Sequence, residues 1–285
     1  MGEGRFVIMD DTACVEFLQW ALPRLRMRWE GFRKVRSQVC KRIKRRIQLL
    51  QLQDVSSYRE YLHHHSEEWE VLDELCRVTI SRFFRDKRVF STLQLEILPE
   101  LVRKMKQRGE EGNILRIWSA GCAAGEEPYS LKILWELDVK QHAADMQPRL
   151  EIVATDSDPQ MLDRAARACY PYSSIKNIPE DWRQLAFDKS NGEFCLLPRF
   201  QQGLNFMRHD VRVETPPGVF DLILCRNLVM TYFEPDLQRQ VLRRLENVLK
   251  PEGMLIIGIH ERLPNDYDGF IARSLRLGIY QRQSK

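Results

Sequence analysis

The chain lacks any long run of apolar residues. No uninterrupted stretch approaches the ~20 residues that a helix needs to cross a bilayer, although 44% of the 285 residues are hydrophobic. The segment MGEGRFVIMDDTACVEF at the start is acidic and does not have the basic and apolar regions of a secretory signal peptide. We therefore expect a cytoplasmic protein that does not insert into a membrane.

Closely spaced cysteines are also missing. The seven cysteines are an odd number, are widely scattered and form no CxxC pair, so the sequence does not indicate a zinc site. The run His63-His64-His65 does not provide one either, because consecutive helical side chains point in different directions. We expect no metal, and we expect the thiols to be reduced, as in cytosolic proteins.

Acidic residues are almost absent from residues 24–46, which hold eleven lysines and arginines and one acid, Glu30. Apolar residues recur here at spacings of three and four, which predicts one face of a helix: Phe32, Val35, Val39, Ile43, Ile47 and Leu50. The basic face, residues 33–46, is either a solvated surface or a docking surface for an acidic partner or nucleic acid. Nucleic acid is the less favoured partner, because interleaved aromatic residues for base stacking are missing.

The sequence pattern changes near residue 110. Residues 1–109 read as a helical N-terminal domain that contains the basic helix, with a helix start capped by Ser57. From residue 110 to 285, strands alternate with helices, which is typical of a parallel α/β sheet. The predicted strands are 115–118, 150–155, 220–225 and 254–259, followed by a closing pair at 270–275 and 277–281.

An insertion interrupts this alternation between Cys169 and Pro217. We expect a small β-subdomain at about 187–208, in which residues 194–197 pair with residues 204–207 as a hairpin. This subdomain is a candidate docking edge for a peptide.

Polar residues follow several predicted strands at the same sheet edge. A turn with Gly121 and Gly125 follows the first strand, Asp156 ends the second, and Cys225-Arg226-Asn227 ends a third. Ligands of open α/β sheets bind at the carboxyl ends of the strands, and an acid there can accept hydrogen bonds from ribose hydroxyls. The turn leads into Glu126-Glu127-Pro128 rather than a phosphate-binding lysine. This combination indicates a cationic ligand without phosphate, and S-adenosylmethionine, a sulfonium, is the leading candidate.

These motifs resemble the CheR-type chemotaxis-receptor methyltransferases, which are protein-glutamate O-methyltransferases, over about residues 25–282. The motifs that carry the resemblance are Phe83-Phe84-Arg85-Asp86, Trp118 to Cys122, Gly125 to Ser130, Ala154 to Asp158, Cys225-Arg226-Asn227, Tyr232-Phe233 and Leu249 to Gly253. The resemblance implies a Rossmann-like S-adenosylmethionine domain that has an inserted β-subdomain and is joined to an all-helical N-terminal domain.

The resemblance also implies a role for individual residues. Those expected to bind the cofactor are Ser81, Arg85, Ser119, Gly121, Glu127, Asp156, Asp210, Val211, Asn227 and Leu228. Arg85, closing the site from the N-terminal domain, and Tyr232, near the transferred methyl, are the expected catalytic residues. The implied partner is an acidic protein substrate, such as a receptor cytoplasmic helix, docked by the basic helix.

Three departures from the family pattern lie on the substrate side. Thr79 to Arg82 contains no asparagine, Asn227 and Tyr232 are one position further apart than usual, and Gly258-Ile259-His260-Glu261 replaces Gly-His-Ser-Glu. The methyl acceptor is therefore open. A small molecule or nucleic acid is the alternative acceptor, and a regulatory module that binds the cofactor without turnover is the alternative class.

Overall fold

The computed structural model describes residues 9–109, 113–143 and 148–283. They divide into two compact units, Met1–Val78 with Thr231–Leu237, and Thr79–Met230 with Gln238–Lys285. Residues 79–109 therefore group with the sheet rather than with the N-terminal helices, in contrast to the expected division at 109/110. None of the helices in the described ranges is long and apolar enough to cross a membrane.

The first unit is helical. Its elements are α1 (Asp11–Ala21), η1 (Leu22–Leu25), α2 (Trp29–Phe32), α3 (Arg36–Leu49), α4 (Val55–His64) and α5 (Glu68–Cys76). Helix α3 confirms the predicted amphipathic helix, with Val39, Ile43 and Ile47 buried, but Phe32 belongs to the separate helix α2. The predicted cap at Ser57 is wrong, because Asp54 is the N-cap of α4 and accepts a hydrogen bond from the Ser57 backbone N–H.

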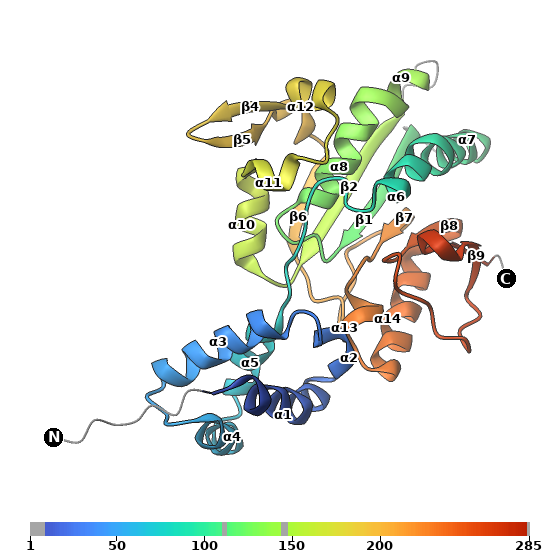
Figure 1. Ribbon diagram of the computed structural model, residues 1–285. Coiled ribbons are helices and arrows are strands. Elements are labelled where there is room, and N and C mark those ends of the chain that lie inside the picture. Colours follow the sequence, from blue (N-terminus) through green and yellow to red (C-terminus); the bar gives the residue numbers. More distant parts are fainter. Residues whose placement is uncertain (1–8, 110–112, 144–147, 284–285) are drawn as a thin grey trace. The chain divides into compact units, whose positions relative to one another are not determined.

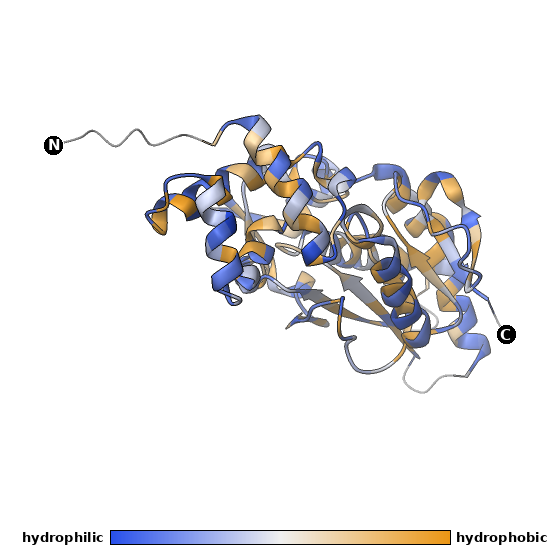
Figure 2. Cartoon of the chain, turned by 90° about the horizontal axis from the view of Figure 1, so that it is seen from below, coloured by the Kyte–Doolittle hydropathy of each residue, from blue (hydrophilic) through white to orange (hydrophobic). Residues whose placement is uncertain are grey.

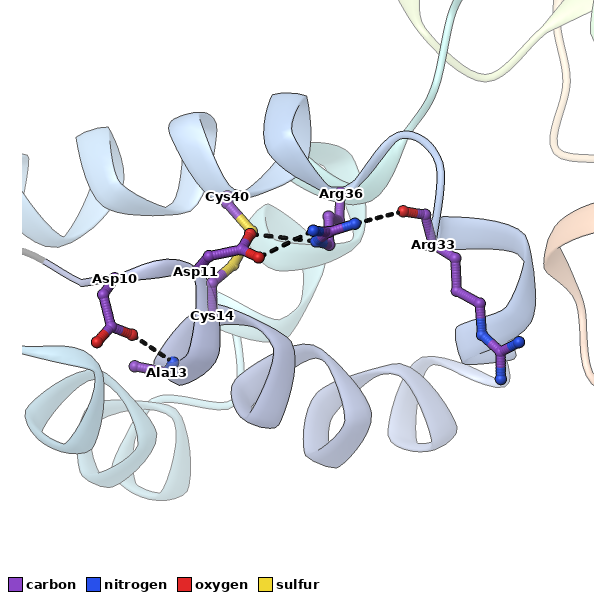
Figure 3. Close-up of a disulfide and its surroundings, with 7 residues drawn as sticks. All are labelled: Asp10, Asp11, Ala13, Cys14, Arg33, Arg36 and Cys40. Carbon is purple, nitrogen blue, oxygen red and sulfur yellow. Dashed lines mark hydrogen bonds and ion pairs between the residues drawn. A yellow bond between two sulfur atoms is a disulfide. The ribbon is translucent and has the colours of Figure 1, made fainter.

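A disulfide joins two helices of this unit. Cys14 on α1 is bonded to Cys40 on α3, and beside it the Arg36 guanidinium pairs with Asp11 at 2.9 Å (Figure 3). The expectation of reduced thiols is therefore wrong for this pair. The two cysteines are 26 positions apart, so only the packing of α1 against α3 brings them together.

The second unit contains a seven-stranded sheet in the order β6-β2-β1-β7-β8-β10-β9. The strands are β1 (Ile114–Ala120), β2 (Arg149–Asp156), β6 (Leu204–Arg208), β7 (Phe220–Leu224), β8 (Leu249–Ile256), β9 (Phe270–Ser274) and β10 (Ile279–Arg282). The pairs from β6 to β8 are parallel, whereas β10 pairs antiparallel with both β8 and β9. The predicted parallel sheet and its closing strand pair are thus confirmed.

Helices cover the sheet and complete its core. Those of this unit are α6 (Lys87–Thr92), η2 (Leu93–Ile97), α7 (Leu98–Gln107), α8 (Glu126–Leu134), η4 (Trp135–Val139), α9 (Lys140–His142), α10 (Pro159–Arg167), α11 (Tyr172–Ile175), α12 (Glu180–Ala186), η6 (Pro198–Phe200) and η7 (Leu275–Leu277). Two more, α13 (Val229–Tyr232) and α14 (Pro235–Val248), run across the division between the units. Helix α7 packs on β1, and α8 and α10 pack on β2 (Figure 1). Hydrophobic residues concentrate along the central strands and on the inner sides of the helices (Figure 2).

The inserted β-subdomain is a separate three-stranded sheet in the order β3-β5-β4, with β3 at Cys169–Tyr170, β4 at Phe187–Ser190 and β5 at Glu193–Leu196. The expected pairing of 194–197 with 204–207 is wrong, because β5 pairs with β3 and β4, and β6 joins the main sheet beside β2. Phe206 explains this choice, since its ring packs on Tyr129 with centroids 5.5 Å apart. A disulfide between Cys169 and Cys195 links β3 to β5.

Candidate cofactor site

The turn between β1 and α8 is held tightly against β2. The backbone N–H groups of Gly121 and Cys122 both donate to the Thr155 carbonyl, at 2.8 and 2.9 Å. Gly121 has φ of +76°, and a Cβ there would lie 2.6 Å from Cδ2 of Leu228. Only glycine fits this position without strain. The close approach brings together two predicted cofactor residues, Gly121 and Leu228.

Asp156, at the end of β2, fixes two neighbouring segments. Its carboxylate accepts the Ala123 N–H at 2.8 Å and the Asp158 N–H at 2.9 Å. Asp158 in turn caps α10 by accepting a hydrogen bond from the Gln160 N–H at 2.9 Å. The carboxylate of Asp156 is therefore oriented at the carboxyl end of the strand, where an acid can bind ribose hydroxyls in folds of this kind.

Asp210 and Val211 lie next to this position. Strand β6 pairs with β2 as far as Arg208 opposite Asp156, and the His209 N–H then donates to the Asp156 carbonyl at 3.1 Å. Val211 is buried, and the Asp210 carboxylate pairs with Arg212 at 2.7 Å. The register of the sheet thus places both predicted cofactor residues just beyond the end of β2.

Glu127, on the first turn of α8, interacts with two other side chains. Its carboxylate accepts the Ser119 hydroxyl at 2.8 Å and pairs with the Arg226 guanidinium at 3.0 Å. Arg226 is buried, and its Nη2 atom also pairs with Asp86 at 2.6 Å and donates to the Arg85 carbonyl at 3.0 Å. Arg226 therefore ties β1, α8, the end of β7 and the segment before α6 into one network.

The charge of this network suits a cation. Two carboxylates, Glu127 and Asp86, share the single guanidinium of Arg226, so the three groups together carry one net negative charge. The cluster is largely shielded from water, which weakens the screening of that charge. A sulfonium or ammonium group bound beside Glu127 would be stabilised, whereas a phosphate would be repelled.

Glu126, the neighbour of Glu127, is a buried carboxyl group. Burial raises the pKa of Glu126, and a hydrogen bond with Ser81 offsets only part of that rise. Its Oε2 atom has no hydrogen-bond partner among the described residues. Ser81, a predicted cofactor residue, therefore lies beside the first turn of α8.

Asn227 has a left-handed backbone, with φ of +55°, and depends on a residue to which sequence reasoning gave no role. The buried Glu261 carboxylate accepts the N–H groups of both Asn227, at 2.8 Å, and Gly258, at 2.6 Å. It thereby fixes the turns that follow β7 and β8. The signal in the sequence was an acid three positions after a strand-end glycine, at the same sheet edge.

The two expected catalytic residues belong to different compact units. Arg85 lies in the unit of the sheet, not in the N-terminal helical unit from which it was expected to act, and its Nη1 donates to the Ile80 carbonyl at 2.7 Å. Tyr232 belongs to the first unit, where its ring packs edge-on against Phe32 with centroids 5.1 Å apart. Its position near a transferred methyl stays a prediction.

The residues at this edge fit S-adenosylmethionine. An oriented acid for the ribose, a tight glycine turn without a phosphate-binding lysine, and a net negative cluster for a cationic group occur together. Within the residues that the structure describes, no group of acids, histidines and cysteines could hold a metal ion.

Comparison with known proteins identifies the family. The family model "CheR methyltransferase, SAM binding domain" matches residues 79–279. A chemotaxis protein methyltransferase of Listeria monocytogenes is 33% identical over 74% of this chain and 77% of its own length, and that of Escherichia coli is 31% identical over 79% and 76%. An uncharacterized 104.1 kDa protein of Rhodobacter capsulatus is 32% identical over 85% of this chain, which spans only 25% of that protein. The chain therefore belongs to the CheR methyltransferase family, and it is a methyltransferase that uses S-adenosylmethionine.

Proposed function

We propose that the chain methylates glutamate side-chain carboxylates of a chemoreceptor or a similar signalling protein. The observation that carries the proposal is the net negative cluster of Glu127, Arg226 and Asp86 beside a phosphate-free turn. Its support from relatives is that two proteins named chemotaxis protein methyltransferase match over three quarters of their own length.

In this proposal the cofactor-binding residues have separate tasks. Ser119 and Arg226 orient Glu127 toward the cationic part of the cofactor, and Asp156 accepts the ribose hydroxyls. Asp210 and Val211 flank the adenine. Asn227 and Leu228, together with Ser81, Arg85 and Gly121, complete the wall.

The chemistry requires positioning more than acid–base catalysis. S-adenosylmethionine supplies a methyl group on a sulfonium; a carboxylate oxygen takes the methyl carbon as the carbon–sulfur bond breaks, which leaves a methyl ester and S-adenosylhomocysteine. A glutamate has a reference pKa of about 4.3 and is already ionised at neutral pH, so no general base is needed. Arg85 would orient the attacking carboxylate by a charge-assisted hydrogen bond, and Tyr232 would lie near the methyl group.

Docking of the acidic substrate is assigned to the outer face of α3. Lys41 and Arg45 are exposed and Lys44 is half-buried, on the side opposite the buried Val39 and Ile43. Other basic side chains of α3 serve the fold instead: Arg42 donates to the carbonyl groups of residues 75 and 77, and Arg46 pairs with Glu68. Docking on a receptor helix also implies the cytoplasm as the location.

The decisive experiment is the stability of the product in base. The full chain is incubated with S-adenosylmethionine labelled in the methyl group and with separate pools of receptor cytoplasmic fragments, nucleic acid and small metabolites. We expect label in the receptor pool that is released as methanol in base, because methyl esters hydrolyse and N-methyl groups do not. Label that remains bound in base would contradict a carboxyl acceptor.

A matched pair of variants separates the site from general effects. Glu127→Gln removes the net negative charge of the cluster, and we expect it to weaken binding of S-adenosylmethionine more than that of neutral adenosine. Glu96→Gln, at an exposed position on η2, serves as the control with unchanged binding. Equal losses for both ligands would show that Glu127 does not recognise the positive charge.

A further inference from the structure

A cavity in the unit of the sheet has a charge character opposite to that of the cluster of Glu127, Arg226 and Asp86. It has a volume of about 650 Å³ and is lined by four basic side chains from three separate segments. Lys87 and Arg88 come from the start of α6, Arg262 from the loop after β8, and Arg276 from η7. None of the residues predicted to bind the cofactor lines it.

The positive charge of this cavity is not balanced from within. In the part of the chain that the structure describes, the side chains of Lys87, Arg88 and Arg276 make no hydrogen bond or ion pair. Asp86 is the acid in the lining, and its carboxylate pairs with Arg226 at 2.6 Å. Four like charges around one hollow repel one another unless an anion is present. The lining of the cavity therefore carries an excess of positive charge, which a bound anion would balance.

Two further features favour a small ligand. Arg262 is preorganised, because its Nη1 donates to the carbonyl groups of Ile259, at 3.1 Å, and Glu261, at 2.6 Å. Ile259 and Leu277 add apolar surface to the lining, on which the body of an organic molecule can pack. Small-molecule sites commonly enclose about 300–1,000 Å³ and combine apolar walls with a few polar groups, and the volume of about 650 Å³ lies within that range.

We propose that this cavity binds a small phosphorylated molecule of the nucleoside diphosphate type. A phosphate monoester carries close to two negative charges at neutral pH, and a diphosphate carries more, which matches several cations better than a single carboxylate does. Arginine also binds phosphate oxygens in a bidentate manner. The cofactor cannot be this ligand, because it is cationic and lacks phosphate. The proposed ligand is thus distinct from the cofactor, and the cavity adjoins the cofactor site through Asp86, which pairs with Arg226 of the charge cluster.

The test is calorimetric titration of the full chain at low and high salt, with saturating S-adenosylhomocysteine present to block the cofactor site. The probes are pyrophosphate, guanosine diphosphate and uncharged guanosine. We expect both anions to bind, guanosine diphosphate more tightly, and guanosine not to bind. The double variant Arg88→Glu/Arg276→Glu should lower the affinity for guanosine diphosphate at least about tenfold, and thermal melting checks that it folds.

Arg103→Glu is the matched control, because Arg103 is an exposed arginine of α7 outside the cavity. It should leave the affinity unchanged. Three results would overturn the proposal: no binding of either anion, an equal loss in the control and the double variant, or tighter cavity-dependent binding of a poly-glutamate peptide than of guanosine diphosphate. The last result would assign the cavity to an acidic protein instead.

Discussion

Single side chains at the proposed cofactor edge serve the fold and, in our proposal, also the ligand. Glu127 begins α8 and faces Ser119 and Arg226, and Asp156 ends β2 while it orients the next helix. Arg85 differs, because its side chain makes one local hydrogen bond, to the Ile80 carbonyl. Loss of its side chain should therefore affect function far more than folding.

Replacement of Arg85 by alanine tests this difference. We expect turnover to fall by about a hundredfold or more, because an acceptor carboxylate loses its orienting partner, while the thermal midpoint stays close to that of the wild type. Methyl transfer to receptor fragments and thermal melting are the two measurements. Arg103→Ala is the control for loss of an exposed arginine, and turnover of Arg85→Ala at the wild-type rate would refute the assigned role.

Glu126 gives a prediction about pH. Because burial raises its pKa in the folded state, the folded protein favours the protonated form, and stability from this group is lost as the pH rises from the unfolded pKa through the folded pKa. Glu126→Gln removes this penalty. We expect the variant to gain stability relative to the wild type as the pH increases above about 4.5.

Urea denaturation of both proteins between pH 4.5 and 8 measures this effect. Glu136→Gln is the contrasting variant: burial raises the Glu136 pKa, but hydrogen bonds from Lys132 and Lys140 outweigh burial and lower it. Its stability relative to the wild type should fall as the pH rises from 3 toward the unfolded pKa of about 4.3 and stay constant above it, so its denaturation series extends down to pH 3. A stability difference for Glu126→Gln that does not change with pH would contradict the prediction.

At the scale of elements, the basic residues of α3 fall into two groups, those that bind other parts of its unit and those on its outer face. Three face other parts of its unit, where Arg36, Arg42 and Arg46 bind Asp11, backbone carbonyl groups and Glu68. The others, Lys41, Lys44 and Arg45, lie on the outer face that we propose as the docking surface. Composition alone could not make this distinction, because all of them occur in one basic run.

The double variant Lys41→Glu/Arg45→Glu should weaken docking of an acidic receptor fragment at least about tenfold and flatten its salt dependence. Activity on a short peptide acceptor should stay unchanged. The measurement is the Michaelis constant for the receptor fragment at several salt concentrations. Arg103→Glu/Lys106→Glu, at two exposed positions on α7, is the matched charge reversal. Unaltered salt dependence in the α3 variant would exclude α3 as the docking surface.

Element types could be predicted well where periodicity was strong. The apolar runs of β1, β2, β7 and β8 and the polar residues at their carboxyl ends define the sheet and its ligand edge. The insertion could not be assigned by pattern alone, because β6 and β5 are both short and apolar. Asn191-Gly192, with φ of +49° and +82°, was the turn signal for the β4–β5 hairpin. The role of Glu261 could not be predicted, because its carboxylate accepts hydrogen bonds from backbone N–H groups, which leave no pattern in the sequence.

On the scale of the whole molecule, each compact unit has its own disulfide, Cys14–Cys40 in the first and Cys169–Cys195 in the second. The other three cysteines, Cys76, Cys122 and Cys225, are buried and free. The sequence could not reveal which cysteines pair. The two cysteines of each disulfide are 26 residues apart, but this spacing indicates a disulfide only once the fold is known to bring the two residues together.

The double variant Cys14→Ser/Cys40→Ser should destabilise the first unit by about 3.5 kcal/mol, the value that chain entropy gives for a loop of this length. The second unit should unfold as before, since its disulfide belongs to a separate compact unit. Calorimetric melting measures both transitions, and thiol titration of the denatured variant should find three free thiols. A lowered second transition would contradict independence of the two disulfides.

Because the chain is synthesised from its N-terminus, the helical unit can be completed only late in translation. Residues 231–237 complete the helical unit, where the Arg28 N–H donates to the Tyr232 carbonyl at 2.9 Å and Met27 forms a bridge with Phe233. This segment leaves the ribosome roughly 150 residues after the helices, which at about 5–20 residues per second is a delay of about 8–30 s. During that interval the nascent helices have an uncovered surface, which exposes them to chaperones and to aggregation.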